Sequence, residues 1–172
     1  MKVLIAVASK HGSTREIAEV IAEVLRAESL DVDLRDLRED GEIGEISRYD
    51  AVVLGSAIYM GNWMPEAKHF AETHRAELAR MPVWLFSSGP LGDANALPKP
   101  DYTLLEAPLG DVKVRDHKVF VGKLDPALLG LGEKLMAKVV KVPAGDFRYW
   151  VEIREWASGV AGELSVQRVA PS

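Results

Sequence analysis

The 172-residue sequence contains no cysteine, which excludes several kinds of chemistry at once. A chain without thiols has no disulfide, no cysteine nucleophile, no iron–sulfur cluster and no zinc site built on cysteine. An excess of positive charge is also missing, because 21 Lys and Arg residues stand against 26 Asp and Glu residues, a net charge of −5. An acidic chain is poorly suited to general nucleic-acid binding, so we expect no nucleic-acid partner.

Long hydrophobic runs are missing as well. No stretch approaches the roughly 20 apolar residues of a membrane span, and the apolar run near the N-terminus is too short for a signal peptide. We therefore expect a cytoplasmic protein, with peripheral membrane contact and a homodimer left open. No repeat or low-complexity linker divides the sequence, which predicts a single domain over residues 1–166 and a loose C-terminal tail over residues 167–172.

Apolar runs alternate with helical patterns along the chain. Continuous apolar runs, typical of strands buried on both faces, lie at residues 3–8, 51–54 and 83–86, an alternating stretch lies at residues 31–37, and a further strand is predicted over 118–121. Helical spacing predicts helices from residue 14, from Pro65, over 126–142 and over 150–166, with a short helix between 37 and 51 and an irregular segment over 91–116. This order predicts an α/β fold with a doubly wound parallel sheet.

Ligands of such a sheet bind at the carboxyl ends of its strands. The loops at those ends are rich in Ser, Thr and Gly, and they span residues 9–14, 56–63 and 87–93. In the first loop, hydroxyl groups and a glycine that permits a tight turn precede a helix, whose free N–H groups and dipole attract an anion. This arrangement suits a phosphate monoester. The alternative, that the hydroxyl side chains simply cap the helix, stays open.

Other phosphate motifs are absent from the sequence. There is no Gly-x4-Gly-Lys-Ser/Thr loop, and no Gly-x-Gly-x-x-Gly follows a strand, which argues against a P-loop or dinucleotide fingerprint. A low-molecular-weight phosphatase would need a cysteine nucleophile in the first loop. A response-regulator receiver would need carboxylates where Ser9 and Ser56 stand.

The first loop resembles the Ser/Thr-x-Thr-Gly-x-Thr loop of the flavodoxin family: Ser9, Gly12 and Thr14 match, and His11 replaces the middle Thr. The resemblance is closer to the flavodoxin-like, quinone-dependent protoporphyrinogen dehydrogenases. It rests on residues 14–18, 54–58 with Gly61, 121–124, 134–136 with Lys138, and the helix of Trp156. The resemblance implies a flavodoxin-like, five-stranded parallel sheet in the order 2-1-3-4-5 with helices on both faces, and FMN as the cofactor.

The same resemblance implies which residues contact FMN. The phosphate would lie on the first loop, at Ser9, Lys10, His11, Gly12, Ser13 and Thr14. The flavin ring would lie between the second loop, which comprises Ser56, Ala57, Ile58, Tyr59, Met60, Gly61, Asn62 and Trp63, and the third, which comprises Ser87, Ser88, Gly89, Pro90, Leu91, Gly92 and Asp93. Tyr59, Met60 and Trp63 offer apolar surface to the ring, and the peptide at Gly61 would hydrogen-bond the flavin N5. We expect no metal, and no residue is a convincing catalytic base.

Two departures from the relatives bear on function. The third loop has no aromatic residue, unlike many electron-carrier flavodoxins, and residues 93–113 hold two lysines against four acidic residues, whereas the dehydrogenases are strongly basic there. We favour an FMN-dependent oxidoreductase whose substrate or acceptor is a quinone, a porphyrinogen or a reduced cofactor. The alternatives are a flavodoxin that carries single electrons between protein partners, and a partner-binding domain without redox activity. A carrier needs negative charge around its flavin, and the loops contain only Asp93 against Lys10.

Overall fold

A computed structural model describes residues 1–59, 61–89, 102–131, 134 and 144–169. Its centre is a parallel sheet in the order β2-β1-β3-β5-β6. These strands are β1 (Lys2–Ala8), β2 (Asp31–Asp36), β3 (Ala51–Tyr59), β5 (Val83–Ser88) and β6 (Val114–Phe120). Counted along the chain, the five parallel strands follow the order 2-1-3-4-5, which confirms the predicted fold. A short strand, β4 (Asn62–Trp63), folds back antiparallel onto the end of β3.

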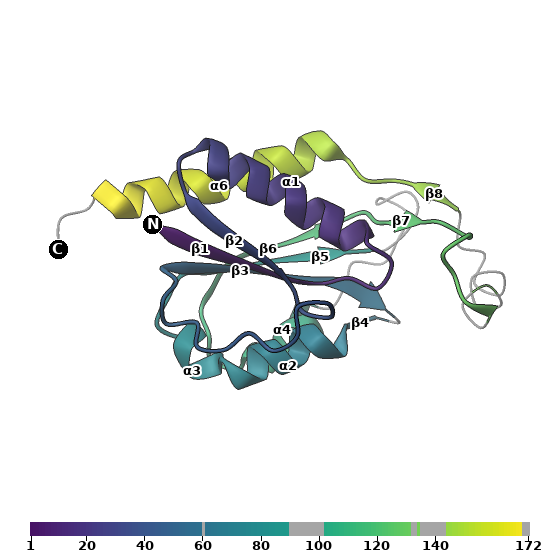
Figure 1. Cartoon of the computed structure of the whole chain (residues 1–172), viewed down its shortest axis with the longest axis horizontal. Coiled ribbons are helices and arrows are strands. Elements are labelled where there is room, and N and C mark those ends of the chain that lie inside the picture. Colours follow the sequence, from purple (N-terminus) through teal and green to yellow (C-terminus); the bar gives the residue numbers. More distant parts are fainter. Residues whose placement is uncertain (60, 90–101, 132–133, 135–143, 170–172) are drawn as a thin grey trace.

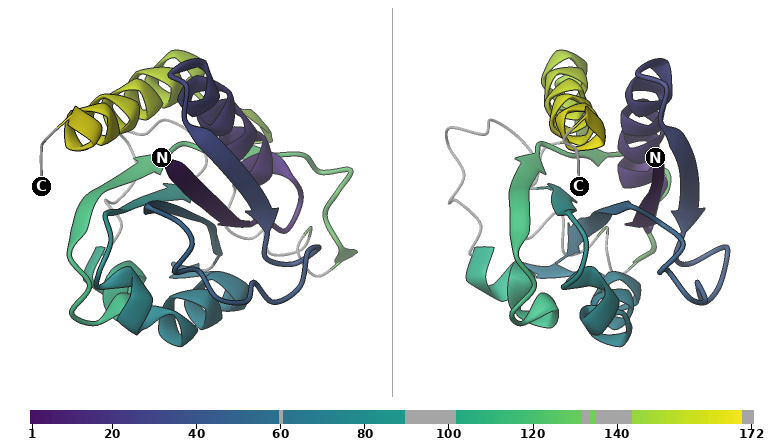
Figure 2. Two further views of the ribbon diagram at one scale, coloured as in Figure 1. Left: turned by 60° about the vertical axis from the view of Figure 1, so that its left-hand side comes forward. Right: turned by 90° about the vertical axis from the view of Figure 1, so that its left-hand side faces the viewer.

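Helices cover both faces of this sheet (Figures 1 and 2). One face carries α1 (Ser13–Ala27) and α6 (Trp150–Val169), which lie side by side, and the other carries α2 (Pro65–Thr73), α3 (Arg75–Leu78), α4 (Tyr102–Glu106) and the 3-10 turn Ala107–Leu109. Alternation along each strand explains the two layers. In β1, Val3, Ile5 and Val7 pack under α1 and α6, and Leu4, Ala6 and Ala8 pack on the opposite face.

The predicted short helix between β2 and β3 is wrong, because turns take its place. Asp36 and Asp40 use their side chains on the backbone: Asp40 Oδ2 accepts the N–H of Asp36 at 2.7 Å, and Asp36 Oδ1 accepts the N–H of Arg38 at 3.0 Å. Such side-chain hydrogen bonds favour turns over helices. The helix that starts at Pro65 is also divided, since it leaves helical geometry at His74 between α2 and α3.

The last strand and both C-terminal helices differ from their predicted limits. β6 starts four residues earlier than the strand predicted from residue 118, and α4 and the 3-10 turn lie within the stretch predicted to be irregular. The predicted helix over 126–142 falls mostly outside the described residues, and its described start, residues 126–128, is a turn. α6 continues to Val169, three residues into the predicted loose tail, while residues 170–172 lie outside the described part.

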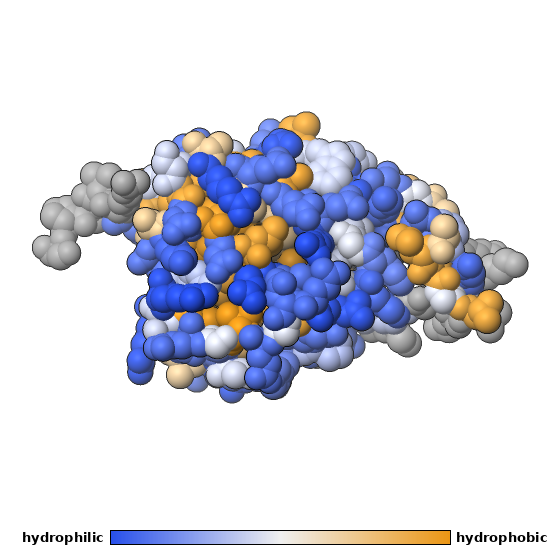
Figure 3. All heavy atoms as spheres, in the orientation of Figure 1, coloured by the Kyte–Doolittle hydropathy of each residue, from blue (hydrophilic) through white to orange (hydrophobic). Residues whose placement is uncertain are grey.

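A second, two-stranded antiparallel sheet joins β7 (Lys123–Leu124) to β8 (Gly145–Asp146) at one end of the molecule. Figure 3 shows apolar surface at this end. Leu128 and Leu131, which follow β7 in the chain, are exposed. Within the described residues, no helix is long and apolar enough to cross a membrane.

Candidate functional site

A hollow at the carboxyl edge of the sheet brings the three predicted loops together. It encloses about 730 Å³ when the open space at its mouth is included. The parallel register explains the meeting, since Ala8 pairs with Ser56 and Ala57 pairs with Ser88 at the ends of β1, β3 and β5. The predicted residues that line the hollow are Lys10, His11, Ser13, Thr14, Ala57, Ile58, Tyr59, Ser88 and Gly89.

A fourth segment, which sequence reasoning missed, completes the hollow. It follows the end of β6 and contributes Gly122, Lys123, Leu124, Asp125, Leu128 and Leu129. The signal was present in the sequence, because the segment follows a predicted strand whose carboxyl end must lie at the same edge of the parallel sheet.

The start of α1 has the geometry of an anion site. Its N-cap is Gly12, with φ +83°, and among the described residues no side chain caps the helix. The first N–H groups of the helix are therefore free for a ligand. Ser9 Oγ, on the same loop, is buried and has no hydrogen-bond partner in the described part of the chain. The reading that these hydroxyl side chains merely cap the helix is therefore wrong.

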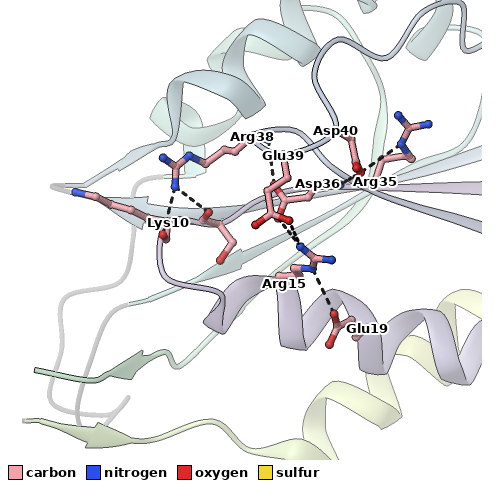
Figure 4. Close-up of polar contacts among 9 residues, drawn as sticks. Lys10, Arg15, Glu19, Arg35, Asp36, Arg38, Glu39 and Asp40 are labelled. Carbon is pink, nitrogen blue, oxygen red and sulfur yellow. Dashed lines mark hydrogen bonds and ion pairs between the residues drawn. The ribbon is translucent and has the colours of Figure 1, made fainter. Parts of the chain in front are cut away.

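An arginine far along the chain fixes the shape of the first loop. Arg38 Nη1 donates to the backbone oxygens of Ser9 at 3.3 Å and Lys10 at 3.2 Å (Figure 4). Its Nε donates to Glu66 at 3.2 Å. Two carbonyl groups of the loop are thereby turned toward Arg38. Sequence reasoning did not find Arg38, because it lies 28 residues from Lys10.

Two further cations anchor α1 beside the loop. Arg15 forms ion pairs with Glu39 and, at 3.7 Å, with Asp36, which tie the first turn of the helix to the end of β2 (Figure 4). On the other side, buried Arg148 donates to the Ser13 oxygen at 3.1 Å and pairs with Asp146 at 2.7 Å. This pairing holds the pKa of the Asp146 carboxyl below its usual value.

The second and third loops contain both a residue exposed at the mouth of the hollow and residues buried within the protein. Tyr59 is exposed at the mouth, where Lys10 Nζ lies 4.6 Å from the centre of its ring and so connects the first loop to the second. Trp63 was expected to contact a ring directly, but it is buried, and its Nε1 donates to Ser87 Oγ at 2.8 Å. Ser56 is buried too, with its Oγ bonded to Met64 N and Ala57 O.

Ser56, Trp63 and Ser87 therefore support the hollow from below and do not line it. Gly61 lies in the turn between β3 and β4, and Asn62, the first residue of β4, pairs with Tyr59; both are exposed, and neither is among the residues that line the hollow. The predicted residues Met60, Pro90, Leu91, Gly92 and Asp93 lie outside the described part of the chain.

Comparison with known proteins assigns this architecture to a family. The model of the flavodoxin domain family matches residues 4–148, which is most of the chain. The chain belongs to the flavodoxin domain family. Its fold also matches an archaeal flavodoxin (TM-score 0.62, 17% identity, 96% of this chain and 99% of the other). It matches the rubredoxin oxygen:oxidoreductase of Desulfovibrio gigas as well (TM-score 0.61, 19% identity, 98% of this chain and 37% of the other).

A curated relative shares more sequence with this flavodoxin domain. Protoporphyrinogen IX dehydrogenase [quinone] of Escherichia coli K12 is 31% identical over 87 residues, which cover 51% of this chain and 48% of the relative. The chain thus spans about half the length of the curated relative that it matches.

Membership in this family implies FMN, and the residues present fit that cofactor. An orphaned buried hydroxyl at Ser9 and an uncapped helix start supply donors for a dianionic phosphate. Ile58, Tyr59, Leu128 and Leu129 supply apolar and aromatic surface for a ring.

Replacing Arg38 by Ala should weaken FMN binding without removing a residue that lines the hollow. The Ser9 and Lys10 carbonyl groups would lose their donors, and the loop its fixed shape, so we expect a roughly tenfold loss of affinity, as for one or two hydrogen bonds to a charged group. Arg35→Ala is the matched control, because Arg35 pairs with Asp40 on the same turn and makes no such bond to the loop. Fluorescence titration measures both. Equal losses in the two variants would show that Arg38 acts only through general stability.

Proposed function

We propose that the chain is an FMN-dependent oxidoreductase that moves a pair of electrons between a small reduced substrate and an acceptor. The observation that carries the proposal is the coincidence of an uncapped helix start, a buried unpartnered Ser9 hydroxyl and an apolar hollow at one edge of the sheet. A phosphate needs the first two features, and a flavin ring needs the third.

The side chains of the chain have distinct roles in this proposal. Ser9 Oγ and the backbone N–H groups at the start of α1 would hold the phosphate, and Arg38 would keep their loop in shape. Ile58 and Leu129 would exclude water from the ring, while Tyr59 would cover its outer edge. When bound, FMN supplies the redox chemistry, because it can take up a hydride or two electrons and return them to an acceptor.

Charge at the mouth favours an enzyme over a carrier of single electrons. The described lining residues include Lys10 and Lys123 against one acid, Asp125. A carrier that docks on protein partners through an acidic face would show the opposite balance. Leu128, which lines the hollow, and Leu131, three residues further along the chain, are both exposed and suit contact with an apolar acceptor, such as a quinone.

The relative named protoporphyrinogen IX dehydrogenase [quinone] supports this choice of acceptor and suggests a porphyrinogen as one candidate substrate. In such a reaction the porphyrinogen would lose hydride and proton equivalents, and the quinone would gain two electrons and two protons. A flavodoxin that exchanges single electrons with protein partners is the second candidate, supported by the family match.

Anaerobic reduction of the FMN-loaded chain distinguishes the two candidates. For the enzyme we expect spectra that pass directly from the oxidised to the two-electron-reduced form, followed by rapid reoxidation on addition of a short-chain quinone. Turnover should then be measured with protoporphyrinogen and with a reduced nicotinamide as separate donors. Stable accumulation of a third spectral species, with no turnover of any small donor, would contradict the enzyme and support the carrier.

A further inference from the structure

A continuous chain of hydrogen bonds runs beneath the hollow, outside the residues that line it. Trp63 Nε1 donates to Ser87 Oγ at 2.8 Å, Ser87 Oγ contacts His117 Nε2 at 2.8 Å, and His117 Nδ1 contacts Glu106 Oε1 at 2.8 Å. The four side chains come from β4, β5, β6 and α4. His117, on the edge strand β6, thus joins side chains of the sheet to Glu106 of α4.

One placement of the protons gives every member of this chain of bonds a partner. An indole N–H can only donate, so Ser87 Oγ accepts from Trp63, and the Ser87 hydrogen finds a partner in this chain of bonds only if it points at His117 Nε2. In that arrangement Nε2 is an unprotonated acceptor, and the hydrogen lies on Nδ1, where it is donated to Glu106. The network is complete only with neutral His117 in this one tautomer.

Burial supports the neutral form. The imidazole side chain is 4% exposed, and burial lowers the pKa of His117, although the Glu106 carboxylate opposes the shift. Among the described residues, the charged groups that act on the ring are Glu106 from α4 and Asp116 from β6 itself. Asp116 is engaged by Trp156 Nε1 at 2.6 Å, while β4 and β5 present the neutral Trp63 and Ser87.

The arrangement resembles a nucleophilic triad, but the burial of its serine excludes that chemistry. Ser87 has no exposed surface, and its Oγ is bonded on both sides, to Trp63 and to His117. No substrate carbonyl can reach a nucleophile in that position. The four hydrogen-bonded side chains therefore have a structural role and do not form a nucleophilic site.

Two walls of the hollow depend directly on this chain. Ser87 immediately precedes Ser88 and Gly89, which line the hollow from β5. Trp63 pairs across the β3–β4 hairpin with Ile58, which lines the hollow from β3. Glu106, at the end of α4, ties both walls to the opposite layer of helices.

We propose that Ser87, His117 and Glu106 are positioning residues of the flavin site, which hold its β3 and β5 walls in place while His117 is neutral and release them when it is protonated. This inference rests on the proposed function. A proton on Nε2 removes the acceptor for the Ser87 hydroxyl hydrogen. Ser87 Oγ can then accept from both Trp63 and His117, but its own buried hydrogen has no partner within this chain of bonds, which disfavours the present geometry. FMN affinity should then fall in acid by more than the titration of the phosphate alone explains.

The test has two readouts, one of which needs no flavin. First, the imidazole ¹⁵N shifts of His117 in the flavin-free protein should report the Nδ1–H tautomer at neutral pH. Second, FMN affinity is measured between about pH 5 and pH 8, the range in which histidine titrates, for the unaltered chain, His117→Gln and Ser87→Ala. His74→Gln is the matched control, because His74 is also buried and paired with a glutamate, Glu77, at 2.8 Å, but its other ring nitrogen contacts the Ile43 oxygen and no member of this chain of bonds.

We expect the unaltered chain and His74→Gln to lose roughly tenfold more affinity in acid than His117→Gln and Ser87→Ala, the effect of one buried hydrogen bond. The phosphate titrates equally in all four proteins, so the difference between profiles isolates His117. An Nε2–H tautomer at neutral pH, or parallel profiles in all four proteins, would overturn the inference. If the unaltered chain binds no FMN at any pH, the proposed function fails and the positioning role fails with it, while the tautomer still reports the hydrogen-bond chain.

Discussion

Ser13→Asp should abolish tight FMN binding while leaving the fold intact or slightly more stable. Ser13 is the first residue of α1 and lines the hollow where the phosphate is expected. A carboxylate at a helix N-terminus stabilises the helix by about 0.3–1 kcal/mol. The same carboxylate lies close to a bound phosphate, and two unit charges 4 Å apart near a protein surface repel by roughly 4 kcal/mol. We expect FMN affinity to fall at least ~100-fold, as measured by fluorescence titration.

Ser13→Asn is the matched control for this substitution, since it has nearly the same shape and no charge. It should change FMN affinity only a few-fold. Riboflavin, which lacks the phosphate, should bind the Asp and Asn variants alike. If Ser13→Asp binds FMN as well as Ser13→Asn does, then the phosphate does not lie at the start of α1.

Gly55→Ala should be the most destabilising single-methyl substitution in the sheet that we can identify. A Cβ at this position would lie 2.0 Å from Phe86 Cζ and 2.3 Å from its Cε1. Phe86 is fully buried and packs against Phe120 and Trp156, with ring centroids 6.3 Å away in each case, so its ring has little room to move. Overpacking of this kind costs about 3 kcal/mol, or roughly 10 °C in Tm for a domain of this size.

Gly159→Ala provides the comparison for Gly55→Ala. Gly159 is exposed on α6, and an added Cβ would meet no atom within 4 Å. Removing a glycine from a helix interior should stabilise the protein by up to ~1 kcal/mol. Urea unfolding of both variants measures the difference. An unchanged free energy of unfolding in Gly55→Ala would mean that the packing of β3 against Phe86 is looser than described.

The most predictable strands of the fold are those that are buried on both faces of the sheet. β1, β3 and β5 are inner strands covered on both faces, so each appears in the sequence as a continuous apolar run. β6 lies at the sheet edge, and its sequence, VRDHKVF, mixes charged and apolar residues. The sequence pattern therefore predicted only the end of β6, from residue 118. It did not place His117 within the strand.

The candidate site also has a part that the sequence predicts and a part that it does not. The loops after β1, β3 and β5 were predictable, because the ends of parallel strands meet at one edge. The contacts that fix those loops were not, because they join residues distant in sequence: Arg38 to Ser9, and His117 to Ser87, 29 and 30 residues apart. Trp63 was predicted to contact the flavin ring because it is aromatic. In the structure it is turned inward, where its indole N–H donates to Ser87 Oγ.

Titration of the flavin-free chain with FMN, riboflavin and FAD tests the central claim most directly, since it asks whether the hollow binds a flavin through its phosphate. The account predicts tight one-to-one binding of FMN and an affinity for riboflavin at least ~100-fold lower, because the donors at Ser9 and the start of α1 would lack their partner. Equal affinity for FMN and riboflavin would contradict the phosphate site. No binding of any of the three would contradict the flavin site altogether.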